Sequence, residues 1–221
     1  MTSARYRRMT GVFLGALLAL LTAGTQAATK YLEGIEYIRI SPLPVETGDK
    51  IEVREIFWYG CPHCYVLEPT LVKWVKTMPA NARFVRMPGV LNPSWADHAR
   101  AYYAFETLGA VDQLHGPLFE AMHKDGRHFN DLDSLAGFVA ERGVDAGKFR
   151  SAFRSFSVDS KVKAAQQRGQ RWGITAVPTI IVDGKFMTNG TLAGGYESMM
   201  QVVEHLIQKS AEERAGGSAR K

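Results

Sequence analysis

The stretch REIFWYGCPHCYVLEP, residues 54–69, contains the only two cysteines of the 221-residue chain, Cys61 and Cys64. It overlaps KIEVREIFWY (50–59), whose β-branched and aromatic residues predict a largely buried strand. After the cysteines, apolar residues recur mostly at helical spacing until Pro79. The sequence therefore predicts a strand that leads into a helix, with Cys61 at the turn between them.

This position favours a reactive Cys61. The free N–H groups and the positive end of a helix start stabilise a thiolate, which is the species that attacks disulfides. Pro62 suits the first helical turn because its missing N–H is not needed there. His63 stabilises the anion through its backbone N–H and, when protonated, through its charge. Cys64 lies one turn further along and is expected to point inward, so we predict that Cys61 attacks and Cys64 resolves.

Two other uses of a close cysteine pair are less favoured. A structural disulfide across four residues removes little chain entropy. A zinc site needs about four ligands, usually in two pairs, but the chain has no second Cys-X-X-Cys. The remaining histidines outside the motif are scattered, and we interpret them as surface or hydrogen-bonded side chains: His98, His115, His123, His128 and His205.

The rest of the chain predicts an α/β protein. A second strand in ARFVRMPGV (82–90) completes a unit of strand, helix and strand. Near the end, Asp183-Gly184 separates two apolar runs and predicts a hairpin, because such a turn needs positive φ. A last helix is expected at 196–209, followed by a disordered tail. Five helical patterns lie between the second strand and the hairpin, at 95–109, 111–126, 131–143, 145–156 and 160–173. This layout favours a mixed sheet covered by helices, with a helical segment inserted between its two halves.

The N-terminus predicts export. Three arginines, an apolar run at 11–24 and small residues after it are typical of a secretory signal peptide cleaved after Ala27. The apolar run is shorter than the roughly 20 residues that span a membrane. Removal of 1–27 takes away three arginines and no acids, which lowers the formal net charge from +5 to +2. Basic and acidic residues are interspersed in the remainder, so nucleic acid is not an expected partner.

Three motifs together are recognisable: CPHC after EIFWYG, AVPT before an apolar strand, and DGKF in the hairpin. With these motifs the chain resembles the DsbA family of thiol:disulfide oxidoreductases. The resemblance implies an α/β thioredoxin fold, a mixed β-sheet flanked by helices, with an inserted α-helical domain. It divides the chain into a signal peptide (1–27), a first thioredoxin-like part (28–91), the inserted helical domain (92–172), a second thioredoxin-like part (173–209) and a flexible tail (210–221).

The resemblance also assigns further site residues. It implies that Val177-Pro178 is a cis peptide beside the sulfurs, where neighbouring backbone groups are free to pair with an extended substrate. Glu55 matches the family's buried acid beneath the active site and implies a role in proton handling near Cys64. The alternative for Glu55 is a carboxylate on an edge strand that faces water.

The sequence departs from the family pattern at two places. Gly60 stands where well-known members carry a bulky residue before the first cysteine, and a smaller side chain there would leave the thiol more open. No lysine in 82–90 matches the cation that accompanies the buried acid in some relatives.

The resemblance implies a monomeric periplasmic enzyme that donates its Cys61-Cys64 disulfide to newly exported, unfolded proteins. A DsbB-like, quinone-linked membrane partner would reoxidise it, and no bound cofactor is needed. One alternative is a disulfide isomerase or reductase of the same fold. Such isomerases usually carry an N-terminal dimerisation domain, whereas only about two dozen residues separate the predicted cleavage site from the first strand. Another alternative is a binding module or holdase in which the cysteines stay idle.

Overall fold

One mixed sheet of five strands organises the part of the chain that the computed structural model describes, residues 31–218. The strands are β1 (Ile38–Arg39), β2 (Ile51–Phe57), β3 (Ala82–Pro88), β4 (Thr179–Val182) and β5 (Phe186–Thr188). Their order across the sheet is β1-β5-β4-β2-β3. β2 is an interior strand, parallel to β3 and antiparallel to β4. The predicted signal peptide at 1–27 lies outside the described residues.

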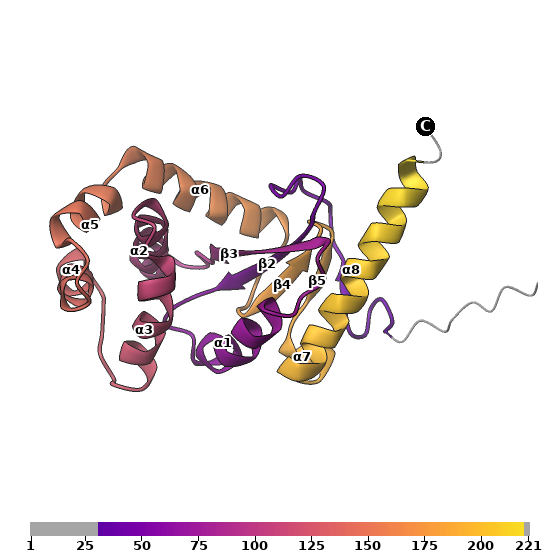
Figure 1. Cartoon of the computed structure of the whole chain (residues 1–221), viewed down its shortest axis with the longest axis horizontal. Helices are drawn as coiled ribbons and strands as arrows, with labels where there is room; N and C mark the ends of the chain where they lie inside the picture. Colours follow the sequence, from indigo (N-terminus) through magenta and orange to yellow (C-terminus); the bar gives the residue numbers. More distant parts are fainter. Residues whose placement is uncertain (1–30, 219–221) are drawn as a thin grey trace, which may run out of the picture. The chain divides into compact units, whose positions relative to one another are not determined.

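Eight α-helices surround this sheet within residues 31–218 (Figure 1). They are α1 (Pro62–Val75), α2 (Ala96–Thr107), α3 (Val111–His123), α4 (Leu132–Glu141), α5 (Ala146–Phe153), α6 (Phe156–Arg171), α7 (Gly190–Ala193) and α8 (Tyr196–Ser218). A 3-10 turn at Pro93–Trp95 precedes α2. Helices α2 to α6 all lie between β3 and β4 in the sequence, so the five helices predicted there are confirmed.

Helices α4, α5 and α6 begin where the sequence supplies a capping side chain. Asp131, Asp145 and Ser155 each accept a hydrogen bond from the backbone N–H three residues further along, at 2.8, 2.9 and 3.2 Å. These bonds satisfy N–H groups that have no partner inside the helix. Local sequence signals therefore set where three of the inserted helices start.

Strand β2 separates two hydrophobic cores because successive side chains of a strand point to opposite faces. Ile51 and Val53 pack in one core with side chains of α1 and α8. Ile56 packs in the other core, with side chains of α2 and α6. Glu55 has the same parity as Ile51 and Val53, so its side chain lies on the face that α1 covers. This placement brings a carboxyl group beneath the helix that carries the cysteines.

The β4–β5 hairpin confirms the turn predicted at Asp183-Gly184. Both residues have positive φ, 53° and 66°, and the N–H of Lys185 donates to the carbonyl oxygen of Val182 across them at 3.1 Å. The register pairs Val182 with Phe186, so three residues separate the paired residues instead of the two predicted. A Cβ atom at Gly184 would also collide with the carbonyl oxygen of Leu43. The turn therefore needs glycine for two reasons, its backbone conformation and the close approach of a neighbouring segment.

The predicted end of the last helix at Lys209 is wrong, because α8 continues to Ser218. Arg214 on the added turns forms an ion pair with Asp183 of the hairpin, and Glu213 bonds to Arg39 of β1 at 2.7 Å. Charged residues that suggested a solvated tail in the sequence instead tie the helix to the sheet. The short elements β1 and α7 were also not predicted, since neither contains a run long enough to show a period.

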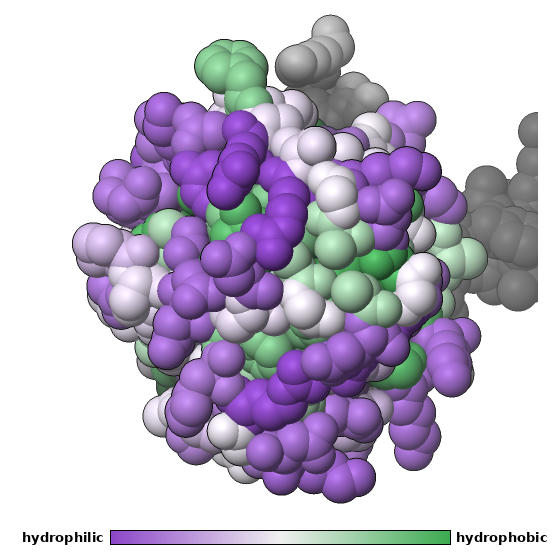
Figure 2. Space-filling view, turned by 90° about the vertical axis from the view of Figure 1, so that its left-hand side faces the viewer, coloured by the Kyte–Doolittle hydropathy of each residue, from purple (hydrophilic) through white to green (hydrophobic). Residues whose placement is uncertain are grey.

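The end of the molecule that carries α4 and α5 has hydrophilic side chains over much of its surface, with smaller apolar areas between them (Figure 2). Phe156, at the start of α6, is 85% exposed.

Within residues 31–218, no helix is both long and apolar enough to cross a membrane.

Candidate active site

Cys61 lies at the junction of β2 and α1, as the sequence predicts. It is the N-cap residue of α1, in extended conformation, and Pro62 occupies the first turn. The backbone N–H of Cys61 donates to the carbonyl oxygen of Trp58 at 3.0 Å, which closes the turn. Both cysteines are free thiols, with Cys61 only 7% exposed and Cys64 fully buried. The attacking sulfur is therefore more enclosed than a surface turn suggests.

The surroundings of Cys61 stabilise its thiolate and lower its pKa to about 6. The largest cause is a hydrogen bond that the Cys64 thiol donates to the Cys61 sulfur. Burial opposes it, and the backbone N–H groups of Cys64 and His63 and the charge of His63 lower the pKa further. The predicted role of the helix start is present, but the main stabilising group is the second cysteine.

Cys64 shows the opposite behaviour, with a pKa far above that of an ordinary thiol. Burial is the largest cause, followed by its hydrogen bond to Cys61 and the negative charge of Glu55. At neutral pH the pair therefore consists of a Cys61 thiolate and a Cys64 thiol. An asymmetric pair of this kind can use one sulfur as nucleophile and keep the other protonated until it is needed.

The loop before β4 forms the second wall of the site. The Val177–Pro178 peptide bond is cis, and the Val177 carbonyl oxygen lies 3.4 Å from the Cys61 sulfur. A groove of about 390 Å³ opens beside it. Its lining includes His63, Val177, Pro178, Asn189, Thr191 and Tyr196. An extended chain in this groove would have backbone groups and a reactive sulfur within reach.

Tyr196 was not predicted as a site residue, although it lines this groove from the start of α8. Its pKa is raised by partial burial and by the charges of Cys61 and Cys64. The sequence offered no signal for it, because α8 meets the site only through the fold.

Glu55 is completely buried on the interior strand β2, so the alternative of an edge-strand carboxylate is excluded. Its Oε2 accepts a hydrogen bond from Nε of Arg86 at 3.1 Å. Burial raises the pKa of Glu55 to about 8 against the opposing charge of Arg86, and the charge of Glu68 contributes to the rise. The carboxyl group is therefore mostly protonated at neutral pH.

Arg86 supplies the cation that no lysine provides. It is the direct neighbour of Glu55 in the register of the parallel strands β2 and β3, and its Nη2 also donates to Glu68 of α1 at 2.7 Å. The sequence signal was available in the ARFVRMPGV strand, where an arginine can replace a lysine as the partner of a carboxylate. Only the register shows which of its two arginines faces Glu55.

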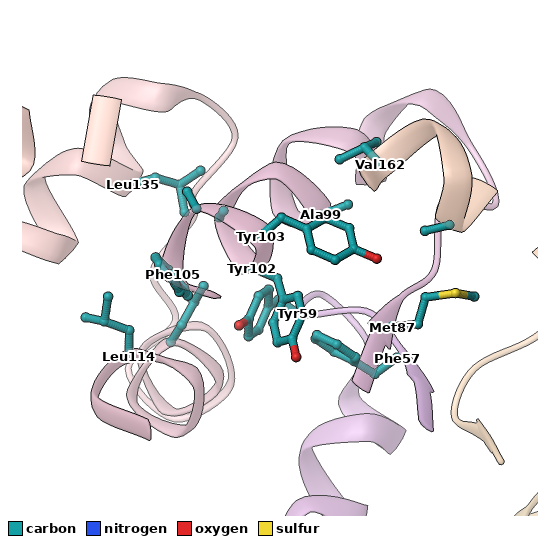
Figure 3. Close-up of a cluster of buried hydrophobic side chains, with 14 of the residues drawn as sticks. Phe57, Tyr59, Met87, Ala99, Tyr102, Tyr103, Phe105, Leu114, Leu135 and Val162 are labelled. Atoms are coloured by element: carbon teal, nitrogen blue, oxygen red, sulfur yellow. The ribbon is translucent and has the colours of Figure 1, made fainter. Parts of the chain in front are cut away.

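The network extends from Glu68 into the helical segment. Nε2 of the buried His115 on α3 lies 3.6 Å from Oε1 of Glu68, and Nδ1 lies 2.9 Å from the hydroxyl of Tyr59. Figure 3 shows Tyr59 beside Phe57 and Tyr102, with ring centroids of Phe57 5.2 and 5.3 Å from those of the two tyrosines. His115 was interpreted from the sequence as a surface or hydrogen-bonded histidine; the structure gives it a buried position with one hydrogen bond.

The space beside Gly60 is filled, contrary to the expectation of a more open thiol. A Cβ atom at Gly60 would collide with the indole ring of Trp58. That ring stacks on Trp95, with centroids 4.2 Å apart and planes 5° from parallel. Gly60 is small because Trp58 folds over it, and the aromatic pair connects the active-site turn to the segment before α2.

Among the residues that the structure describes, no three His, Cys, Asp or Glu side chains gather as a metal site would require.

Comparison with known proteins agrees with this arrangement. The family model of the DSBA-like thioredoxin domain matches residues 52–206. The thiol:disulfide interchange protein DsbA of Pseudomonas aeruginosa is 37% identical over 204 residues, which cover 91% of this chain and 97% of that protein. DsbA of Pseudomonas syringae pv. tomato is 38% identical over 213 residues, covering 95% and 98%. The crystal structure of Pseudomonas aeruginosa DsbA superposes with a TM-score of 0.79 over 86% of this chain and 97% of that chain, at 38% identity. The chain therefore belongs to the DsbA family of thiol:disulfide oxidoreductases, built on a thioredoxin fold with a helical insertion.

Proposed function

We propose that this protein donates the Cys61–Cys64 disulfide to newly exported, reduced proteins. The observation that carries the proposal is the asymmetry of the two thiols, with the pKa of Cys61 lowered to about 6 and that of Cys64 raised far above the usual range. A folded state that stabilises the Cys61 thiolate favours the dithiol form over the disulfide. The disulfide is then readily given to another protein.

The reaction proceeds by two exchanges that balance in atoms and electrons. A substrate thiolate attacks Cys61, forms a mixed disulfide and releases Cys64, which takes up one proton. A second substrate thiol, after losing its proton, attacks the substrate sulfur of the mixed disulfide and releases Cys61 as a thiolate. The substrate gains a disulfide and loses two electrons, which the reduced cysteine pair now holds.

The neighbouring residues have separate roles in this proposal. Pro62 fixes the first turn of α1, and His63 contributes a backbone N–H and a charge to the Cys61 anion. Val177 and Pro178 present backbone groups to an extended substrate in the adjoining groove. Glu55 is the source of the proton that Cys64 takes up, which is supported by its burial and by its charge effect on Cys64.

We propose a periplasmic location in a Gram-negative bacterium after cleavage of residues 1–27, and reoxidation by a DsbB-like, quinone-linked membrane partner. The family membership and the basic, apolar and small segments of the N-terminus support this placement. The protein acts as a monomer without a bound cofactor. Residues 92–172 form the inserted domain between the two thioredoxin-like parts, 28–91 and 173–209, a division supported by the five helices between β3 and β4.

A Cys64→Ala variant tests the proposal. In cells, this variant should accumulate complexes with exported proteins through Cys61 that appear on non-reducing gels and disappear on reduction. A Cys61→Ala variant should form none, because the remaining sulfur is buried. A binding module would capture the same proteins noncovalently in both variants and after loss of both thiols, and that result would overturn the proposal. A second assay supplies a protein with scrambled disulfides as substrate. An isomerase or reductase would rearrange or reduce these disulfides faster than it oxidises dithiols.

A further inference from the structure

Five side chains from different parts of the fold form one buried polar cluster below the cysteines. Glu55 of β2 and Glu68 of α1 share the guanidinium of Arg86 from β3, at 3.1 and 2.7 Å. His115 of α3 faces Glu68 at 3.6 Å and bonds to the hydroxyl of Tyr59 at 2.9 Å. Glu55 and His115 are almost completely buried, and the side chains of Glu68 and Arg86 are 13% and 16% exposed. The cluster links the helical segment to the strand beneath the active site.

The cluster holds two carboxyl groups for one guanidinium. If both carboxyl groups were ionised, a net negative charge would remain in a largely buried space, which is strongly unfavourable. One proton is therefore shared between Glu55 and Glu68 at neutral pH. Glu55 Oε1 and Glu68 Oε2 are buried atoms without a hydrogen-bond partner in the described chain, so either carboxyl group has room to carry it.

His115 biases where this proton lies. Nδ1 of His115 is hydrogen-bonded to the Tyr59 hydroxyl. In the tautomer in which the hydroxyl donates this bond, the proton of the neutral ring lies on Nε2, the atom that faces Glu68 at 3.6 Å. Burial and the charge of Arg86 lower the pKa of His115 against the effect of Glu68 and keep the ring neutral. An N–H directed at Glu68 stabilises its carboxylate form. The proton is left on Glu55, the carboxyl group on the strand beneath the cysteines.

We propose that His115 is a positioning residue for disulfide transfer: by holding Glu68 as a carboxylate against Arg86, it keeps on Glu55 the proton that Cys64 takes up. The inference rests on the proposed function and deepens it. When the disulfide opens, the Cys64 thiolate receives this proton, and the Glu55 carboxylate that remains is stabilised by Arg86. The helical segment thereby contributes a residue that acts on the cysteines only through Glu68, Arg86 and Glu55.

Several titratable and charged groups of the surrounding elements act on the carboxyl groups, on His115 or on Cys64, and each enters the pH dependence. They are Cys64 and Cys61 at the start of α1, Arg86 on β3, Tyr102 on α2, His115 with Asp112 on α3, and Tyr59 after β2. Tyr59 and Tyr102 are kept neutral by burial, which raises the pKa of each. At neutral pH, removal of His115 would therefore redistribute the proton that Glu55 and Glu68 share, and would leave both tyrosines neutral.

The test is a titration of Glu55 in the reduced protein with the carboxyl carbons of glutamate labelled for NMR. Wild type should titrate at about 8. In His115→Phe, Glu68 takes the proton and Arg86 pairs with Glu55 alone, so the pKa of Glu55 should fall by about 1 to 3 units, the range for a carboxylate beside arginine. His115→Gln, whose amide can still donate to Glu68, should restore much of the wild-type value. An unchanged Glu55 titration in His115→Phe would overturn the inference.

If His115→Phe does not fold, the Tyr59→Phe variant tests the same inference. It removes only the hydroxyl that fixes the tautomer of His115, and should move the Glu55 titration in the same direction by a smaller amount. Tyr103→Phe is the matched control, because Tyr103 is a buried tyrosine of α2 for which the described residues show no hydrogen bond or ring contact with His115. Equal effects of Tyr59→Phe and Tyr103→Phe on the Glu55 titration would contradict the inference.

The activity readout separates this inference from the proposed function. Oxidised wild type and His115→Phe are given a reduced, unfolded protein, and the ratio of their rates is followed from pH 6 to pH 8. The ratio of variant to wild-type rate should be highest at pH 6 and fall towards pH 8, because the variant loses its Glu55 proton at lower pH than wild type does. A ratio independent of pH would refute the role of His115. Failure of wild type to transfer any disulfide would refute the proposed function instead.

Discussion

The reduced protein should gain stability relative to the oxidised protein as the pH rises from about 5 to 9. The cause is Cys61, whose pKa is about 6 in the folded dithiol form and 9.0 for an ordinary thiol. Between these values the unfolded chain binds one more proton than the folded chain, so the free energy of unfolding rises with pH and is lost again as pH falls through about 6. From pH 5 to pH 7 the gain is about 1.4 kcal/mol. Screening by solvent on the open side of the sulfur lowers it to about 1 kcal/mol.

Above about pH 9 the difference should decrease, because the unfolded chain then releases the proton that buried Cys64 retains. Urea unfolding of both redox forms at pH 5, 6, 7 and 8 measures the effect. Subtracting the free energy of unfolding of the oxidised form removes the contribution of most other titrating groups, which are present in both forms. A reduced Cys61→Ser variant is the control and should show no such gain. A difference between the redox forms that stays constant or shrinks from pH 5 to pH 7 would refute the reasoning.

Three substitutions test other parts of the structure by urea unfolding. Glu55→Gln should stabilise the protein by on the order of 3 kcal/mol at pH 7 and by little at pH 4, because burial raises the pKa of Glu55 from 4.5 to about 8; an equal gain at both pH values would contradict this cause. Gly60→Ala should destabilise by about 1 to 3 kcal/mol through collision with Trp58, and the loss should largely disappear in a Trp58→Ala background. Arg214→Ala should cost about 1 to 2 kcal/mol, because it removes an ion-pair partner of buried Asp183; an unchanged stability would show that the last turns of α8 are not held by this pair.

The sequence was sufficient where local chemistry decides the structure. The Asp183-Gly184 turn, the capped start of α4 at Asp131 and the place of Cys61 at a helix start each depend on neighbouring residues alone. Such signals act over a few positions, so they can be read without knowing the fold. The family resemblance added the Val177–Pro178 peptide, whose relation to Cys61 spans more than one hundred residues.

The residues that tune the site could not be found in this way. Arg86, Glu68 and His115 come from three different elements, and only the register of two strands and the packing of two helices bring them together. The length of α8 depends on ion pairs that Arg214 and its neighbour make with the sheet. Sequence patterns report the propensity of a segment, whereas these contacts depend on partners distant in the chain.

The most direct test of the central claim is the reduction potential of the Cys61–Cys64 pair, measured by equilibrating the purified protein with glutathione buffers and quantifying free thiols. A pair whose thiolate is stabilised as found here should be a strong oxidant, with a potential well above the roughly −270 mV of thioredoxin. Cys61→Ser, which cannot form the disulfide, provides the baseline for the thiol count. A potential at or below that of thioredoxin would contradict the proposal that this protein gives its disulfide away.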